Sequence, residues 1–301
     1  MLSRLNQDYA IPELVSFRLS PAGVIIMEID NDFAQASLSL SGGQLLSWQP
    51  KDQAEPVIWL SEQAVIAPGK SIRGGVPVCW PWFGAHPSAS DVPNHGYART
   101  SEWQVTETCA LENGETEVEL VLIENDESKR LWPHDTPLSL RLTVGQSLNM
   151  SLTTHNKGDE EVILSEALHT YFHISDIGEI SISGLSDTDY LDKVEDFARK
   201  TQQGDIQFSG ETDRVYIHSD SECTLHDPSL KRRIHIEKSS SASTIVWSPW
   251  TEKAHNMGDL GENNGWRRMV CVESGNALEN TLKLPAGQSH TLNVRYFVSD
   301  I

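Results

Sequence analysis

LSLRLTVGQSLNMSLTT, residues 138–154, alternates apolar and polar side chains on both sides of a Gly145-Gln146 pair. A period of two residues is typical of half-buried strands, because successive side chains of a strand point to opposite faces. A glycine-containing pair between two such runs is typical of a tight turn. We therefore predict an antiparallel β-hairpin over this stretch.

The same period recurs toward both ends of the chain, at residues 34–40 and 292–296. Helical periodicity is scarce, and its best candidate is the weak pattern of residues 189–198. We find no domain linker, no low-complexity tract and no repeat of roughly 20 to 50 residues. The sequence therefore predicts an all-β fold, one large antiparallel β-sandwich with few short helices, forming a single domain over residues 1–301.

The composition is strongly acidic. The 301 residues include 43 acidic and 23 basic side chains, for a formal net charge of −20. This charge repels the nucleic-acid backbone and anionic lipid surfaces, so we expect neither as a partner. A small anionic ligand would need a local cluster of arginines to overcome the overall field.

Nothing in the sequence predicts export or a membrane span. Residues 1–20 contain no continuous apolar segment of the signal-peptide type, and no run reaches the roughly 20 apolar residues of a spanning helix. The four cysteines are widely spaced and form no CxxC pair, as is typical of free thiols in a reducing compartment. We expect a cytoplasmic protein, and we expect it to be a monomer.

Two long segments, residues 68–100 and 247–268, resist interpretation as strands and are dense in Trp, Pro, Gly, Arg and His. Long irregular segments are often functional. The first contains Arg73 and Arg99, whose guanidinium groups could together hold a phosphate with bidentate geometry. The alternative is that both arginines are solvated and paired with some of the many acidic side chains.

Two histidines lie in the segment SEALHTYFHI, residues 165–174. Read as a strand, the segment places His169 and His173 on the same face but roughly 13 Å apart, too far to share one metal ion. Read as a helix, it would set them side by side, as in zinc-binding helices. The pattern favours the strand, so we predict no metal site. For either histidine alone, a structural or surface role is the alternative.

Two acidic residues stand out by their position. Glu273 follows the apolar run 269–272 and precedes a Ser-Gly-Asn turn, so we expect it at or near the end of a strand. Its alternative is an exposed carboxylate. Asp213 is followed directly by Arg214, and this pair could equally be a solvated charge pair in a turn.

Taken together, six motifs resemble the hexose-6-phosphate mutarotase branch of the aldose 1-epimerase family, and they occur in the family's order over most of the chain. The resemblance implies a β-sandwich of the galactose-mutarotase type and an enzyme that needs no metal and no cofactor. The motifs are IRGGVPVCWPWFG (72–84), NHGYAR (94–99), ALHTYFHI (167–174), FSGETDRVY (208–216), VWSPWTEKAHNMGDL (246–260) and MVCVESGNA (269–277).

The resemblance also assigns roles to particular residues. His169 matches the general acid and Glu273 the general base of a ring-opening reaction that interconverts the α and β anomers of a sugar phosphate. A histidine with a pKa near neutrality and an ionised carboxylate suit these tasks. Where the family more often has a Pro-Gly step after the base, this chain has Ser274-Gly275.

Five further residues match positions that contact the substrate. The resemblance implies that Arg73 and Arg99 bind the phosphate, that Asn94 and Asp213 contact the substrate, and that His95 binds the sugar. The expected partner is thus a small sugar phosphate.

Two other interpretations stay open at this stage. A non-catalytic carbohydrate-binding sandwich would keep the groove without turnover, but binding alone requires neither an acid nor a base. A glycoside hydrolase would need two carboxylates, and Glu166 alternates onto the face opposite His169, which makes it a poor second partner for Glu273.

Overall fold

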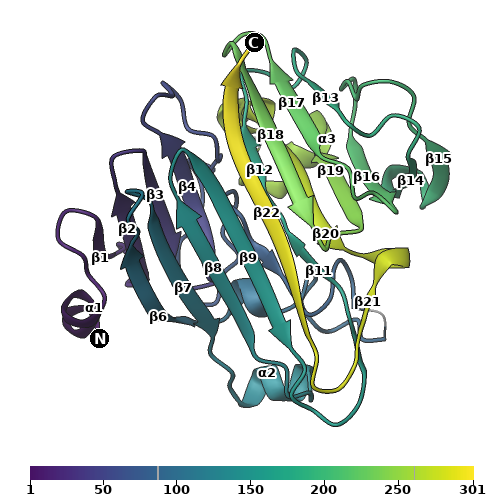
Figure 1. Ribbon diagram of the computed structural model, residues 1–301. Helices are drawn as coiled ribbons and strands as arrows, with labels where there is room; N and C mark the ends of the chain where they lie inside the picture. Colours follow the sequence, from purple (N-terminus) through teal and green to yellow (C-terminus); the bar gives the residue numbers. More distant parts are fainter. Residues whose placement is uncertain (87, 261) are drawn as a thin grey trace.

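The computed structural model describes residues 1–86, 88–260 and 262–301. The most extensive layer is an eight-stranded antiparallel sheet, here called the front sheet, which faces the viewer in Figure 1. Its strands in spatial order are β13 (Ser181–Ser183), β17 (Cys223–Asp227), β18 (Arg232–Ser239), β22 (Ser289–Asp300), β9 (Ser147–His155), β8 (Leu138–Val144), β7 (Thr116–Leu122) and β6 (Trp103–Ala110).

A second eight-stranded sheet, here called the site sheet, consists of shorter strands. Its strands are β15 (Ala198–Thr201), β14 (Asp189–Asp192), β16 (Thr212–Ile217), β19 (Ser243–Ser248), β20 (Met269–Asn276), β11 (Glu166–Leu168) and β5 (Val78–Cys79), with β12 (Tyr171–His173) also paired to β20.

Two smaller sheets complete the β structure of the described residues. They comprise a four-stranded sheet of β1 (Val15–Leu19), β2 (Ile25–Asp30), β3 (Ala34–Ser39) and β4 (Gln44–Pro50), and the pair β10 (Val162–Leu164) and β21 (Leu282–Leu284).

Helices are short and few, as predicted. The α-helices are α1 (Leu2–Asp8), α2 (Asp126–Leu131) and α3 (Trp250–Met257), and the 3-10 helices are η1 (Ala98–Thr100), η2 (Lys193–Glu195), η3 (Glu262–Arg268) and η4 (Leu278–Asn280). Within the described residues, no helix has the length and apolar character needed to cross a bilayer.

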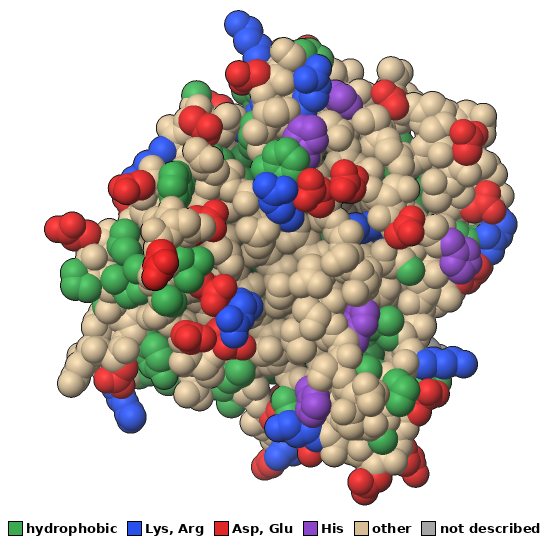
Figure 2. All heavy atoms as spheres, viewed as in Figure 1, with side chains coloured by type: hydrophobic (Ala, Val, Ile, Leu, Met, Phe, Trp, Pro, Cys, Tyr) green, Lys and Arg blue, Asp and Glu red, His purple; other side chains and the backbone are tan. Residues whose placement is uncertain are grey.

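The predicted hairpin is confirmed. Strands β8 and β9 pair antiparallel in the register Leu140 to Leu152, and Leu140 is fully buried. Its outward neighbour Arg141 is exposed and Ser139 is partly exposed, because alternate side chains of a strand face opposite sides of the sheet. The face that the front sheet presents in Figure 2 is accordingly polar, with acidic and basic side chains scattered around it.

The front sheet and the site sheet pack against each other through large side chains. The ring of Phe172 in β12 lies 5.2 Å from that of Tyr296 in β22, and Thr170 shares a 2.7 Å hydrogen bond with the same tyrosine hydroxyl. Such contacts join the two sheets into a sandwich with an apolar core between them. The predicted all-β class and sandwich architecture are confirmed.

The weak helical prediction for residues 189–198 is wrong. This segment forms β14, the single turn η2 and the first residue of β15, with Leu191 paired to Arg199 on one side and to Val215 on the other. Residues 190–192 pair with a strand on each side, and this tertiary gain exceeds a weak helical preference.

The long irregular segments mostly behave as predicted. Residues 68–100 contain no described strand or helix beyond β5 and η1, whereas residues 247–268 include α3 and η3. Both segments approach the site sheet, where they contribute to the cavity described below.

Candidate active site

A cavity of about 370 Å³ opens over the site sheet. It gathers all seven residues singled out from the sequence, although they are spread from position 73 to position 273. Its lining residues are Arg73, Phe83, Asn94, His95, Arg99, His169, Lys193, Asp213, Ile245, Trp247, Lys253, Met257 and Glu273. The irregular segment 68–100 supplies both arginines, Asn94 and His95, whereas strands β16 and β20 supply the two carboxylates, Asp213 and Glu273.

His169 lies at a break in the predicted strand. The segment 165–174 forms β11 and β12, separated by His169 and Thr170, so the prediction of one continuous strand is wrong. Both pieces pair with the uninterrupted β20, and the backbone N–H of His169 instead donates to Pro77 O at 3.0 Å. The break thus places the imidazole opposite the middle of β20.

Glu273 lies inside β20 and not at its end, so the predicted strand end is wrong. The strand continues to Asn276 because Gly275 allows a close approach: a Cβ at this position would lie 2.4 Å from Glu166 O. The Glu273 side chain is only 1% exposed, which also makes the alternative of an exposed carboxylate wrong.

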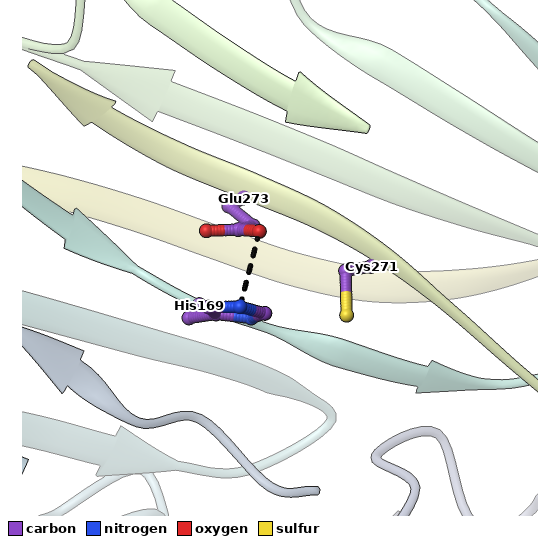
Figure 3. A group of neighbouring side chains, drawn as sticks. All are labelled: His169, Cys271 and Glu273. Carbon is purple, nitrogen blue, oxygen red and sulfur yellow. Dashed lines mark ion pairs between the residues drawn. The ribbon is translucent and has the colours of Figure 1, made fainter. Parts of the chain in front are cut away.

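These two residues face each other directly. Nε2 of His169 lies 3.4 Å from Oε1 of Glu273, as Figure 3 shows. The imidazole stacks on Tyr171, with ring centroids 4.9 Å apart and planes 9° from parallel, which sets its orientation. One carboxylate and one imidazole thus meet in a buried setting where either can hold the proton between them.

Burial determines the protonation of this pair. It raises the pKa of Glu273 well above its ordinary value, a change that Lys193 opposes, Asp213 reinforces and Arg99 opposes. Burial lowers the pKa of His169 well below 6.5, and His95, Arg99 and Arg73 act in the same direction. This direction differs from the near-neutral histidine pKa expected from the sequence. Near pH 7 the pair favours its uncharged form and holds one proton.

His95 presents a defined tautomer. Its Nδ1 accepts a hydrogen bond from the Gly84 backbone N–H at 3.3 Å and lies 3.5 Å from Cys79 Sγ. Burial and the neighbouring cations lower the pKa of this histidine to about 3, so the ring is neutral. With Nδ1 as an acceptor, Nε2 carries the hydrogen and can donate to a hydroxyl.

The two arginines differ in their partners. Nε of Arg73 lies 3.0 Å from Asp259 Oδ2, and its Nη1 donates to the Tyr171 hydroxyl at 3.0 Å. Arg99 instead donates through Nη2 to Asn94 O at 2.8 Å and has no carboxylate partner among the described residues. The alternative of two solvated arginines paired with acids therefore fails for Arg99, and for Arg73 only the pairing holds, because its side chain is 25% exposed.

Asp213 is a buried member of the cavity and not a solvated turn residue. It lies in β16, and its Oδ2 is 3.0 Å from Nζ of Lys193. Its neighbour Arg214 turns away and contacts Gln202 and the ring of Tyr190. The alternative of a solvated Asp-Arg charge pair is wrong.

Sequence reasoning missed several lining residues. Lys193 lies in the segment 189–198, whose pattern indicated a weak helix. Its approach to the cavity depends on the pairing of β14 with β15, which that pattern did not predict. Trp247 and Lys253 lie in the long segment already marked as functional, but nothing in their spacing distinguished them. His173, by contrast, lines a different cavity with Ser61 and Arg268.

His169, Cys271 and Glu273 offer ligand atoms within 4.8 Å of one another, a donor set of the type that binds zinc (Figure 3). The surroundings oppose this use. Burial raises the pKa of the Cys271 thiol well above its ordinary value, whereas a metal needs the thiolate. Arg73, Arg99 and Lys193 add positive charge to the same cavity. The arrangement suits an anion better than a cation.

The model of the family described as aldose 1-epimerase matches residues 26–296. The chain belongs to this family. A protein of Escherichia coli K12 named "Putative glucose-6-phosphate 1-epimerase" is 35% identical over 288 residues, which cover 94% of each chain. A protein of the same name from Cenchrus ciliaris is 35% identical over 265 residues, covering 84% of this chain and 78% of that one.

Solved structures agree with the family. A crystal structure from Salmonella typhimurium, described as a "putative mutarotase (YeaD)", superposes with a TM-score of 0.90 at 29% identity and covers 97% of this chain and 96% of that one. A galactose mutarotase related enzyme from Lactobacillus acidophilus superposes with a TM-score of 0.72 at 14% identity, over 91% and 97% of the two chains, and shows the shared fold. The predicted family, galactose-mutarotase fold and epimerase class are confirmed.

Proposed function

We propose that this enzyme interconverts the α and β anomers of an aldohexose 6-phosphate such as glucose 6-phosphate. The observation that supports this most directly is one cavity that combines a buried acid–base pair with an arginine lacking any carboxylate partner among the described residues. The relatives named glucose-6-phosphate 1-epimerase support the same substrate class.

In the proposed reaction, Glu273 removes the proton of the C1 hydroxyl while His169 protonates the ring oxygen. The bond between C1 and the ring oxygen breaks and leaves the open-chain aldehyde. Rotation by about half a turn around C1–C2 presents the other carbonyl face, and the reverse proton transfers close the ring. Each cycle returns both protons, so no oxidant or other reactant is consumed.

The electrostatics of the Glu273–His169 pair favour these proton transfers. Before ring opening, Glu273 must be a carboxylate and His169 an imidazolium. This charged form differs from the uncharged form only in the position of one proton, which moves between two atoms 3.4 Å apart. Ring opening converts the pair to a carboxyl and a neutral imidazole. Burial favours that uncharged form, so it assists the proton transfers that open the ring.

The phosphate is proposed to bind Arg99 and Arg73. Arg99 has unused donors, and its Nε is buried without a hydrogen-bond partner. A phosphate dianion would satisfy such donors with charge-assisted bonds. We further propose that Asn94, His95 and Asp213 contact the sugar, that the chain acts as one domain, and that it is a cytoplasmic monomer. The thiols support the reducing location, because none of the four cysteines is in a disulfide.

Polarimetry or exchange NMR of freshly dissolved α-glucose 6-phosphate tests the proposal. We expect the purified protein to accelerate equilibration of the phosphorylated sugar far more than that of glucose at equal concentration. Equal rates on both sugars would contradict the phosphate role. Binding of glucose 6-phosphate without any acceleration would instead indicate the carbohydrate-binding alternative.

A further inference from the structure

Lys193 is a charged residue of the cavity to which the motifs assign no role. It begins η2 directly after strand β14, and the carboxylate of Asp192 caps this turn by accepting from the Val194 N–H at 3.2 Å. The side chain reaches the cavity, where its Nζ lies 3.0 Å from Asp213 Oδ2 and 5.9 Å from the centre of the Phe83 ring. It is 26% exposed, so it is partly shielded from water.

The other lysine and arginines of the cavity are arranged differently. Arg73 is paired with Asp259, and Lys253 is paired with Glu211 at 2.6 Å, so both cations face carboxylates that do not line the cavity. Arg99 has no carboxylate partner in the described part of the chain. Lys193 alone among these four is ion-paired with a carboxylate that itself lines the cavity.

That carboxylate, Asp213, shares the cavity with Glu273. Two carboxylates in one buried space repel each other, and one of them takes up a proton unless a cation compensates. Lys193 contacts Asp213 directly and acts on Glu273 through its charge. The other titratable or charged groups that interact with Glu273 come from several elements; they are Cys79, Arg99, His169, Tyr171, Asp213, Cys271 and Tyr296.

We propose that Lys193 is a positioning residue for the ring-opening reaction: its ammonium group fixes Asp213 toward the sugar and balances the negative charge that Glu273 carries when it acts as the base, which makes that carboxylate easier to form. This inference rests on the proposed function. Among the charged neighbours of Glu273, Lys193 is the strongest that opposes the effect of burial on its pKa, and Asp213 acts in the opposite direction. Lys193 therefore acts through two other residues, without itself exchanging a proton with the substrate.

The competing role for Lys193 is direct binding of the phosphate. Measurements of KM and kcat distinguish the two roles. A phosphate ligand contributes to binding, so its loss raises KM for glucose 6-phosphate with little change in kcat. A residue that sets the ionisation of the base alters kcat and moves its pH dependence.

The test compares Lys193→Met and Lys193→Arg with the parent enzyme. We expect kcat of Lys193→Met on glucose 6-phosphate to fall about tenfold or more at pH 7, and the pH dependence of kcat to move to higher pH, because loss of a nearby cation raises the pKa of a carboxyl. Lys193→Arg should retain most of the parent's kcat and of its pH dependence. A raised KM with unchanged kcat, or a lower kcat with an unmoved pH dependence, would overturn the proposal.

A second measurement is independent of activity. The carboxyl ¹³C signal of Glu273, assigned by its loss in Glu273→Gln, should titrate at higher pH in Lys193→Met than in the parent. Lys51→Met provides the control, because it removes a lysine paired at 2.8 Å with Asp30 on the four-stranded sheet. An unchanged Glu273 midpoint would refute the role of Lys193. If Lys193→Met does not fold, Lys193→Gln replaces it with the same expectations.

These readouts also separate the inference from the proposed function. A parent enzyme that fails to equilibrate glucose 6-phosphate would refute the mutarotase proposal, while the titration would still report whether Lys193 controls Glu273.

Discussion

The front sheet and the site sheet each have eight strands but differ in their patterns of burial. Strand β7 of the front sheet alternates strictly between buried and partly exposed residues, as does most of β8 and β9. In the site sheet, every residue of β19 and β20 is buried. The front sheet thus has one face in water, whereas the centre of the site sheet is enclosed on both faces.

Because the centre of the site sheet is enclosed, its polar residues are buried at a cost in folding free energy. The enclosed strand β20 contains Glu273, Ser274 and Asn276, which are nearly inaccessible. Burying such groups is unfavourable unless they are paired, and Oε2 of Glu273 has no hydrogen-bond partner in the described structure. In β8, by contrast, the buried positions are apolar. We infer that the front sheet supplies stability and that the site sheet gives up some stability for chemistry.

The largest expected effect is on catalysis by Glu273 and His169, and it separates catalysis from stability. Glu273→Gln and His169→Asn should each lower kcat on glucose 6-phosphate by about 10² to 10⁴, because each removes a proton-transfer group. Glu273→Gln should leave the free energy of unfolding at pH 8 unchanged or higher. Burial raises the pKa of Glu273 in the folded state, so its ionisation costs stability as the pH rises, and an amide avoids that cost.

Polarimetry measures the first effect and chemical denaturation the second. Normal turnover by folded variants would exclude the acid–base assignment. A marked loss of stability in Glu273→Gln would contradict the division between the two sheets.

A substitution in the front sheet should have the opposite effect, a loss of stability without a loss of catalysis. Leu140→Ala removes a fully buried side chain of β8, which should lower the free energy of unfolding by about 2 to 5 kcal/mol. Because Leu140 does not line the cavity, kcat per folded molecule should remain close to that of the parent. Leu142→Ala, two residues along the same face, provides a second sample of the same effect. Loss of turnover in fully folded Leu140→Ala would show that the sheets are coupled.

Within the site, the arginines provide a smaller contrast. Arg99→Gln should raise KM for glucose 6-phosphate by roughly 10- to 100-fold, the loss expected for charge-assisted hydrogen bonds. Glucose serves as the control substrate, and its turnover should change little. Arg73→Gln should weaken phosphate binding too, but it also leaves Asp259 without its ion pair at 3.0 Å. An unaltered KM in Arg99→Gln would indicate that the phosphate binds elsewhere.

The smallest expected effect concerns a contact that joins the two sheets. His290 in β22 lies 2.9 Å from the buried carboxylate of Glu166 in β11. Burial lowers the pKa of His290, but the hydrogen bond and charge of Glu166 outweigh it and raise that pKa above 6.5. A raised folded pKa adds stability that is fully present below pH 6.5 and is lost as the pH rises through the folded value.

His290→Asn should therefore lower the free energy of unfolding by about 1 to 2 kcal/mol near pH 6 and by less near pH 9. Urea denaturation at both pH values measures the difference. A deficit of the same size at both pH values would mean that the charge of His290 does not contribute.

Much of the front sheet was readable from the sequence, because its side chains alternate between an apolar core and water. The hairpin of β8 and β9 followed from local pattern and one turn. The break between β11 and β12 could not be predicted, because every residue from Glu166 to Ile174 is compatible with a continuous strand. The break arises from the backbone of β20 and from the bond to Pro77, which are remote in the chain.

The sequence alone determined the β class, the family and the identity of the acid, base and arginine candidates, because these depend on residue type, order and local periodicity. Only the tertiary structure decided that Glu273 is buried inside a strand, that Arg73 is paired while Arg99 is available, and that Lys193 reaches Asp213. The physical reason is that burial and charge pairing depend on distances between segments far apart in the chain. Those same distances set the pKa values on which the proposed chemistry depends.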